Sequence, residues 1–155
     1  MIKRELYMNR IRPFIGGELI KVMTGIRRSG KSVMLELIKE ELAEAGVAPS
    51  QMISINFEDM RYSHLQTATA LHDEIIKRAE GIEGKAYLFF DEIQEVEGWE
   101  KCVNSLRVAL DCDIYITGSN AKLLSGELAT YIGGRYVEFV IYPFSFAEFL
   151  ELYHT

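Results

Sequence analysis

The sequence predicts an α/β fold in which a mostly parallel sheet carries helices on both faces. Along its 155 residues, short apolar runs of strand length alternate with longer stretches in which apolar residues recur at helical spacing. That alternation is typical of βαβ units and therefore of a parallel sheet. A glycine-rich motif at the first strand-to-helix junction adds a second indication, because parallel α/β folds bind phosphate at such junctions.

Buried strands are expected where β-branched and aromatic residues cluster, at Leu19–Thr24, Met52–Phe57, Ala86–Phe90, Ile114–Thr117 and Tyr136–Ile141. Helices are expected between them, at Lys31–Ala45, Ala68–Glu80, Trp99–Leu110 and Lys122–Tyr131. In the first helix the apolar stripe is formed by Val33, Leu37, Ile38 and Leu42, and Gly46 ends the helix.

Each end of the chain adds a helical segment. Residues 1–17 are expected to form a helix and a turn, with the helix over Lys3–Arg12 and its end at Pro13. Its inward-facing residues are expected to be Ile2, Leu6 and Ile11. Residues 146–155 begin an amphipathic helix, so we expect residues 1–155 to form a single domain that leads into a missing C-terminal region.

Composition excludes several classes of protein. Apolar residues make up 48% and charged residues 26%, which is ordinary for a globular domain and argues against disorder. The longest apolar runs are about five residues, far too short to span a membrane. Charges run through the first 13 residues, so we do not expect them to form a secretory signal. The two cysteines and three histidines are scattered, so we expect no metal site built from them. We therefore expect a reduced, soluble, cytoplasmic protein.

The net charge of −6 argues against a general nucleic-acid binder, but it hides an asymmetry. Eight basic and two acidic residues lie within the first 31, whereas the remainder has nine basic and 21 acidic residues. The basic segment suggests an anionic partner. Nucleic-acid binding through Lys3, Arg4, Arg10 and Arg12 is possible but not indicated, because the acidic remainder restricts it to one face.

The phosphate-binding motif G-x-x-x-x-G-K-S is matched without exception by Gly25, Ile26, Arg27, Arg28, Ser29, Gly30, Lys31 and Ser32. Its glycines let successive N–H groups point into one concavity, and the following helix adds a partial positive charge there. Lys31 can reach the β- and γ-phosphates, and Ser32 offers a hydroxyl to Mg²⁺. We include Val33, the next residue, in the nucleotide-binding set. Arg27 and Arg28 contact phosphate, a neighbouring subunit or only water.

Two carboxylates, Asp91 and Glu92, follow the apolar run Tyr87–Phe90. This pattern predicts a buried strand that delivers acids to the ligand-binding edge of the sheet. Asp91 would help to hold Mg²⁺, and Glu92 would orient or deprotonate the water that attacks the γ-phosphate. The alternative is that both residues begin an exposed acidic loop. If they do not, an available Glu92 favours hydrolysis over small-molecule kinase chemistry, since a kinase must not activate water.

With these motifs, the sequence resembles an AAA+-type ATPase. It is most similar to the bacterial and archaeal AAA-domain ATP-binding proteins that carry a C-terminal domain of unknown function. The resemblance also includes Thr117-Gly118-Ser119-Asn120, Gly134-Arg135 and the segment Tyr142–Phe146. It implies a P-loop NTPase three-layer sandwich with a parallel five-stranded sheet, whose strands, numbered along the chain, have the order 5-1-4-3-2.

The resemblance also implies roles for two polar positions. Asn120, or else Ser119, would be the sensor that positions the attacking water, although a simple helix cap is an alternative. Arg135 would act as an arginine finger across the subunits of a homo-oligomer, or else pair with surface acids. ATP and Mg²⁺ are the implied cofactors.

These features lead to the hypothesis of a domain that hydrolyses ATP to ADP and phosphate with Mg²⁺ and drives a conformational change in a partner or missing domain. The first alternative is a nucleotide-gated binding module with little or no hydrolysis. A small-molecule kinase is a further alternative that Glu92 disfavours.

Overall fold

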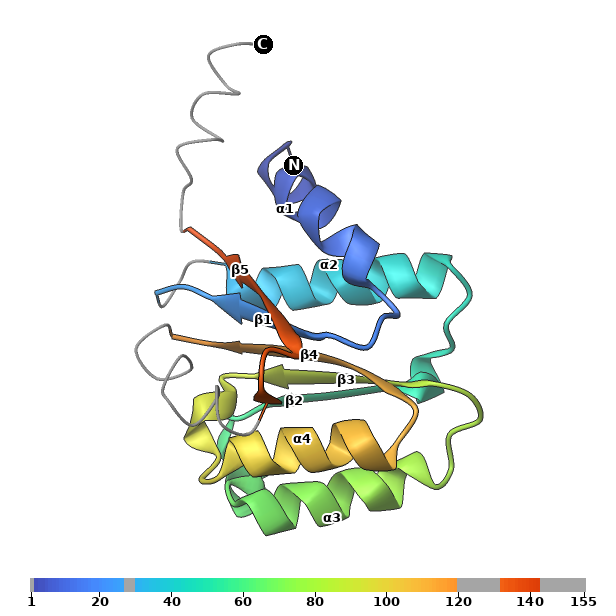
Figure 1. The fold of residues 1–155 in the computed structure, drawn as a ribbon, viewed down its shortest axis with the longest axis vertical. Coiled ribbons are helices and arrows are strands. Elements are labelled where there is room, and N and C mark those ends of the chain that lie inside the picture. The colour runs from blue at the N-terminus through green and yellow to red at the C-terminus, as the bar shows by residue number, and fades with distance from the viewer. Residues whose placement is uncertain (1, 27–29, 120–131, 143–155) are drawn as a thin grey trace.

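One parallel sheet organises the computed structural model, which describes residues 2–26, 30–119 and 132–142 (Figure 1). Its strands are β1 (Ile20–Thr24), β2 (Met52–Asn56), β3 (Ala86–Asp91), β4 (Cys112–Gly118) and β5 (Tyr136–Val140). The order across the sheet is β2-β3-β4-β1-β5, and every neighbouring pair is parallel. Read from the other edge this is 5-1-4-3-2, so the predicted order is confirmed. All five strands therefore present their carboxyl ends to one edge.

Helices cover both faces of the sheet. As Figure 1 shows, α1 (Ile2–Ile11) and α2 (Lys31–Glu44) lie on one face, and α3 (Ala68–Ala79) and α4 (Trp99–Ala109) lie on the other. Short 3-10 turns connect these elements: η1 (Arg12–Phe14), η2 (Pro49–Gln51), η3 (Met60–Leu65) and η4 (Ile93–Glu95). The structure thus has the predicted three layers.

Two apolar cores lie on opposite sides of the sheet. Alternate strand residues supply them, because successive side chains on a strand point to opposite faces. Val22 and Ile116 pack in the core beneath α3 and α4, whereas Met23 and Tyr115 pack in the core beneath α1 and α2. Every residue of β1 is buried, as expected for a central parallel strand. This packing on both faces fixes the edge at which the polar residues gather.

The N-terminal helix packs differently from the prediction. Ile11 is buried as predicted, but Leu6 is exposed, and Tyr7 and Met8 complete the buried face of α1. The Tyr7 hydroxyl accepts a hydrogen bond from the Tyr142 backbone N–H at 3.1 Å, which ties this face of α1 to the chain that follows β5. The prediction was wrong for Leu6 because periodicity alone leaves the phase of a short helix undetermined.

An ion-pair network holds α1 against α2. Arg12, the first residue of η1, donates to Glu41 of α2 at 2.5 Å and to Glu5 of α1 at 2.5 Å. Two carboxylates therefore engage one of the four basic side chains considered for nucleic-acid contact.

The predicted stripe of α2 also needs correction. Val33 is 42% exposed, and the buried residues of this helix are Lys31, Met34, Leu35, Ile38 and Leu42. The helix is rotated so that Val33 faces away from the core, toward a groove described below.

Two predicted helices, at Lys122–Tyr131 and over residues 146–155, lie outside the residues that the structure describes. Within the described residues, no helix combines the length and the apolar content that crossing a membrane requires.

Candidate active site

The loop between β1 and α2 brings a helix N-terminus to the carboxyl edge of the sheet. Gly30 is the N-cap of α2 and has φ +96° and ψ +16°, a left-handed conformation that glycine adopts without a Cβ penalty. The first turn of α2 consequently points its free N–H groups, with their partial positive charge, toward this edge. Arg27, Arg28 and Ser29 lie outside the described residues.

Lys31 is the first residue of α2 and is only 5% exposed. Its Nζ donates to the carbonyl oxygen of Gly25 at 2.7 Å and lies 3.3 Å from Oε1 of Glu92. The ammonium is thus held between the phosphate-binding loop and one of the two predicted acids. Ile26, the neighbouring loop residue, is 66% exposed.

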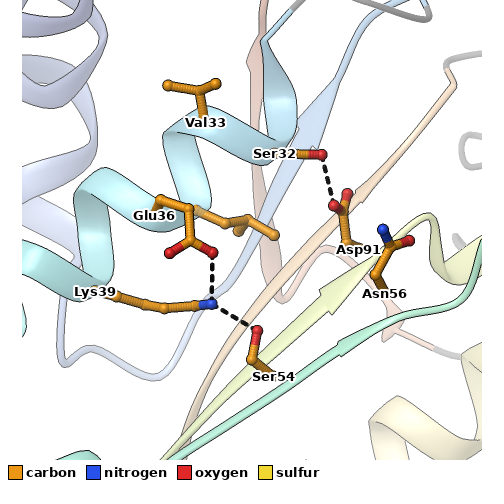
Figure 2. A pocket seen from close by; sticks show the side chains of 8 residues that line it. Ser32, Val33, Glu36, Lys39, Ser54, Asn56 and Asp91 are labelled. Carbon is orange, nitrogen blue, oxygen red and sulfur yellow. Dashed lines mark hydrogen bonds and ion pairs between the residues drawn. The ribbon is translucent and has the colours of Figure 1, made fainter. Parts of the chain in front are cut away.

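Ser32 and Asp91 meet at the same edge. Asp91 is the last residue of β3, one residue beyond the predicted strand, and is 8% exposed. The Ser32 hydroxyl donates to Asp91 Oδ2 at 2.5 Å. The two predicted metal-binding residues, from α2 and from β3, therefore stand side by side (Figure 2).

The donor set of Ser32 and Asp91 fits Mg²⁺. A hydroxyl and a carboxylate are the hard oxygen ligands that this ion prefers, usually together with water and substrate phosphates. Among the described residues, no group of three or more His, Cys, Asp or Glu side chains is arranged to hold a metal ion. The two oxygens therefore suit an ion that arrives with a polyphosphate better than an ion held by protein ligands alone.

Glu92 follows β3 with unusual backbone geometry. It has φ +57° and ψ +51°, and it is the one non-glycine residue with a positive φ in the part of the chain that the structure describes. Its side chain is directed between Lys31 and Gln94, whose Nε2 donates to Glu92 Oε2 at 3.2 Å. Glu92 is only 8% exposed, so the pair does not begin an exposed acidic loop.

Thr117 links the two acids. The β3–β4 register pairs Phe90 with Ile116, so Asp91 and Thr117 come next on neighbouring strands. The buried Thr117 hydroxyl donates to Asp91 Oδ1 at 2.5 Å and accepts from the Glu92 backbone N–H at 2.9 Å. The family resemblance placed Thr117 at the tip of its strand, beside the γ-phosphate, but gave it no contact with the two acids. The strand register was the signal that could have predicted this contact.

A groove of about 280 Å³ opens beside Ser32 and Asp91 (Figure 2). Its far wall is polar: Lys39 Nζ donates to Glu36 Oε1 at 2.8 Å and to Ser54 Oγ at 2.6 Å. Val33, Leu35 and Asn56 complete the lining. Of these groove residues, only Ser32, Val33 and Asp91 belong to the predicted site.

The remaining predicted site residues lie elsewhere. Asn120 lies outside the described residues, and Ser119 follows β4 directly at the carboxyl edge, half-buried. Arg135 is exposed and precedes β5, and its carbonyl oxygen accepts from the N–H of Ile20 at the start of β1. Arg135 therefore lies at the amino edge of the sheet, about 15 Å from the carboxyl edge for strands of five residues.

Comparisons with known proteins identify the family and the fold of the chain. The profile of an AAA domain family matches residues 17–150. An uncharacterized protein of Haemophilus influenzae is 48% identical over 151 residues, which cover 97% of this chain. The chain spans only 38% of the length of that relative.

Solved structures with the same fold share little sequence with the chain. A DNA polymerase III gamma subunit-related protein of Thermotoga maritima superposes with a TM-score of 0.64 at 12% identity, over 94% of this chain and 48% of its own. The ORC2 protein of Aeropyrum pernix, solved in an ADP form, gives a TM-score of 0.60 at 10% identity, over 97% of this chain and 49% of its own. These similarities, with the strand order, confirm the predicted P-loop NTPase fold.

Proposed function

The chain belongs to the AAA domain family of P-loop ATPases, and from this premise we propose that it binds ATP with Mg²⁺ and hydrolyses it to ADP and phosphate. The supporting observation is that Lys31, Ser32, Asp91 and Glu92 converge at one edge of the sheet, with Lys31 Nζ 3.3 Å from Glu92 and Ser32 Oγ 2.5 Å from Asp91. The ADP form of the structurally similar ORC2 protein supports the choice of ligand.

The phosphate-binding loop holds the polyphosphate in this proposal. Gly30 turns the chain so that the first N–H groups of α2 face the ligand, and Lys31 supplies the positive charge. Lys31 now donates to the Gly25 carbonyl and contacts Glu92. Phosphate oxygens would replace these two acceptors, which frees the Glu92 carboxylate for a second task. Arg27, Arg28, Ser29 and Val33 remain proposed members of the same site.

Ser32 and Asp91 would hold Mg²⁺, which neutralises the charge that develops on the transferred phosphoryl group. Asp91 is fixed for this role by donors from two other elements, Ser32 of α2 and Thr117 of β4. The carboxylate therefore need not reorganise on binding.

Glu92 is the proposed general base. Once released from Lys31, the Glu92 carboxylate orients the attacking water or accepts a proton from that water. Gln94 restrains the Glu92 side chain through its hydrogen bond. Asn120, and Ser119 beside it, remain proposed as the residues that position that water.

Arg135 is proposed to act on the ATP of a neighbouring subunit in a homo-oligomer. Its place at the amino edge puts the nucleotide of its own subunit out of reach, which supports action across an interface. We further propose that hydrolysis drives a conformational change in a partner or in a C-terminal region beyond these residues.

One observation favours the alternative of a binding module with little or no hydrolysis. A base that is engaged by Lys31 is not available to deprotonate water, so slow turnover follows if nucleotide binding fails to separate Lys31 from Glu92.

Calorimetric titration with Mg·ATP, combined with a phosphate-release assay, tests the proposal. Lys31→Ala should remove measurable binding of Mg·ATP. Lys77 is an exposed lysine on α3, so the control variant Lys77→Ala should bind Mg·ATP as the parent does. Glu92→Gln should bind ATP normally and stop turnover, with the exposed Glu95→Gln as its matched control.

The outcomes separate the two functions. Binding without phosphate release by the parent chain would favour the binding module. Undiminished affinity in Lys31→Ala would contradict nucleotide binding at this loop.

A further inference from the structure

We infer that Thr117 is a positioning residue for the proposed hydrolysis: its hydroxyl holds the Asp91 carboxylate and the Glu92 backbone in their working geometry at the same time. The inference rests on the proposed function of the site. The inference goes beyond the proposed function because it gives one side chain of β4 the task of aligning both the proposed metal ligand and the proposed base.

The polarity of the two hydrogen bonds is unambiguous. A backbone N–H only donates, so the Thr117 oxygen must accept from Glu92 at 2.9 Å. An ionised carboxylate only accepts, so the hydroxyl proton must go to Asp91 Oδ1, which is 2.5 Å away. Thr117 is fully buried, which shields both bonds from competing water.

The Asp91 carboxylate is thereby divided between two donors. Oδ1 is held by Thr117 from β4, and Oδ2 faces Ser32 from α2 at 2.5 Å. The plane of the carboxylate is fixed, and the oxygen that meets Ser32 is the one directed to the proposed Mg²⁺ position. Removal of a residue that hydrogen-bonds a metal ligand typically lowers metal affinity or activity by about 10- to 100-fold.

The same hydroxyl supports the strained backbone of Glu92. A left-handed conformation is unfavourable for a residue with a Cβ, and Glu92 adopts it at φ +57°. The bond to Thr117 satisfies the amide that this conformation turns toward β4. The resulting turn directs the carboxylate toward Lys31 and Gln94. Without the hydroxyl, a buried N–H would be left unpaired, which favours another backbone conformation and a misplaced base.

Two matched pairs of residues isolate the hydroxyl. Thr117 and Thr117→Val have nearly the same shape and differ in the hydroxyl, and Thr117→Ser and Thr117→Ala differ in the same group at smaller volume. If Thr117→Val fails to fold cooperatively, the serine–alanine pair carries the test. A role in packing alone would separate Thr and Val from Ser and Ala, whereas a positioning role separates Thr and Ser from Val and Ala.

Three measurements are made on each variant. The first is hydrogen exchange of the Glu92 amide in the free protein, which needs neither nucleotide nor turnover; we expect it to accelerate about 10- to 100-fold in the variants without the hydroxyl. The second is the Mg²⁺ concentration that half-maximally promotes ATP binding, which should rise by a similar factor of about 10- to 100-fold. The third is the rate of phosphate release, which should fall in the variants without the hydroxyl. ATP affinity in EDTA should stay within about twofold of the parent, since Thr117 is not expected to contact phosphate.

Equal Mg²⁺ dependence and equal Glu92 exchange in Thr117 and Thr117→Val would overturn the inference, as would failure of Thr117→Ser to restore either property relative to Thr117→Ala. Failure of the proposed function looks different, because the parent chain itself would then bind no Mg·ATP, and the inference would fall with it.

Discussion

The Lys21 ammonium and the Asp113 carboxylate form an ion pair at the amino edge of the sheet, and neither side chain is exposed. Asp113 Oδ2 also accepts from the backbone N–H of Gly16 at 2.8 Å and from the Tyr115 hydroxyl at 2.5 Å. Lys21 Nζ donates in addition to the carbonyl of Gly17 at 2.8 Å. This network connects β1 and β4 to the turn that leads into β1, and it fixes the start of the strand whose other end begins the phosphate-binding loop.

Removal of one partner of this pair should be strongly destabilising. Asp113→Asn leaves a buried ammonium without its counter-charge, and we expect a loss of about 3–5 kcal/mol in the free energy of unfolding. Lys21→Met should lower the free energy of unfolding by a similar amount, because it leaves the buried Asp113 carboxylate without its counter-charge. The double variant should lose less than the sum of the two, because no uncompensated charge remains. Urea unfolding of the four proteins gives the coupling energy, and additive losses would argue that the pair is not coupled.

The strands were predictable because the buried parallel strands are short apolar runs that stand out from the amphipathic helices around them, whereas their order was implied only by the resemblance to AAA+-type ATPases. The phosphate-binding loop was predictable because its glycines and its lysine occupy fixed positions relative to a strand and a helix. The apolar runs and the loop motif are local in sequence. Gly30, for example, adopts a left-handed conformation, in keeping with the prediction that the glycines of the motif let the backbone curl around a phosphate.

Features that depend on register or helix phase could not be predicted in the same way. The choice between Leu6 and Tyr7 as the buried residue of α1 depends on what the helix packs against, and the same holds for Val33 of α2. Lys21 and Asp113 are 92 residues apart, and they meet because β1 and β4 are neighbours. Thr117 reaches the two acids only through the β3–β4 register.

Gly30 should be required for nucleotide binding beyond its contribution to stability. Gly30→Ala forces a residue with a Cβ into φ +96° at the N-cap of α2, so the free N–H groups of the loop should move out of alignment. Gly46→Ala is a matched control near the other end of α2, where φ is +100° and no atom lies within 4 Å of an added Cβ. Both variants should lose about 1 kcal/mol of stability, while only Gly30→Ala loses at least about 10-fold in Mg·ATP affinity. Equal affinities in the two variants would contradict this prediction.

Both cysteine thiols should be protected in the folded protein. Burial raises the pKa of Cys102 to about 12 and the pKa of Cys112 to about 11. At pH 8 the thiolate fraction of either is therefore about 0.1% or less, and the thiolate is the reactive form. An aromatic disulfide reagent should react at least about 100-fold more slowly with native than with urea-unfolded protein. The rate should rise as pH rises, since more thiolate forms.

Single serine variants assign the two thiol rates. Cys112 is half-buried and has the lower pKa, so the chain that retains only Cys112 should react faster than the chain that retains only Cys102. Rapid labelling of native Cys102 would show that α4 opens far more readily than its packing implies.

Mixing Arg135→Ala subunits with Lys31→Ala subunits should restore part of the ATPase activity, because an intact Arg135 is proposed to act on the nucleotide of a neighbouring subunit and not on that of its own. The amino edge that carries Arg135 and the carboxyl edge that carries Lys31 are separated by the length of the strands, so Arg135→Ala and Lys31→Ala damage different interfaces of an oligomer. Each variant should release little phosphate alone. In a randomly mixed ring at equal amounts, about a quarter of the interfaces pair an intact Lys31 with an intact Arg135, so about a quarter of the parental rate should return. Differently labelled subunits verify that exchange has occurred, and Arg78→Ala, whose arginine pairs with Glu74 on α3, is the control that should stay active by itself. No recovery after verified exchange, or full activity of Arg135→Ala alone, would exclude action across subunits.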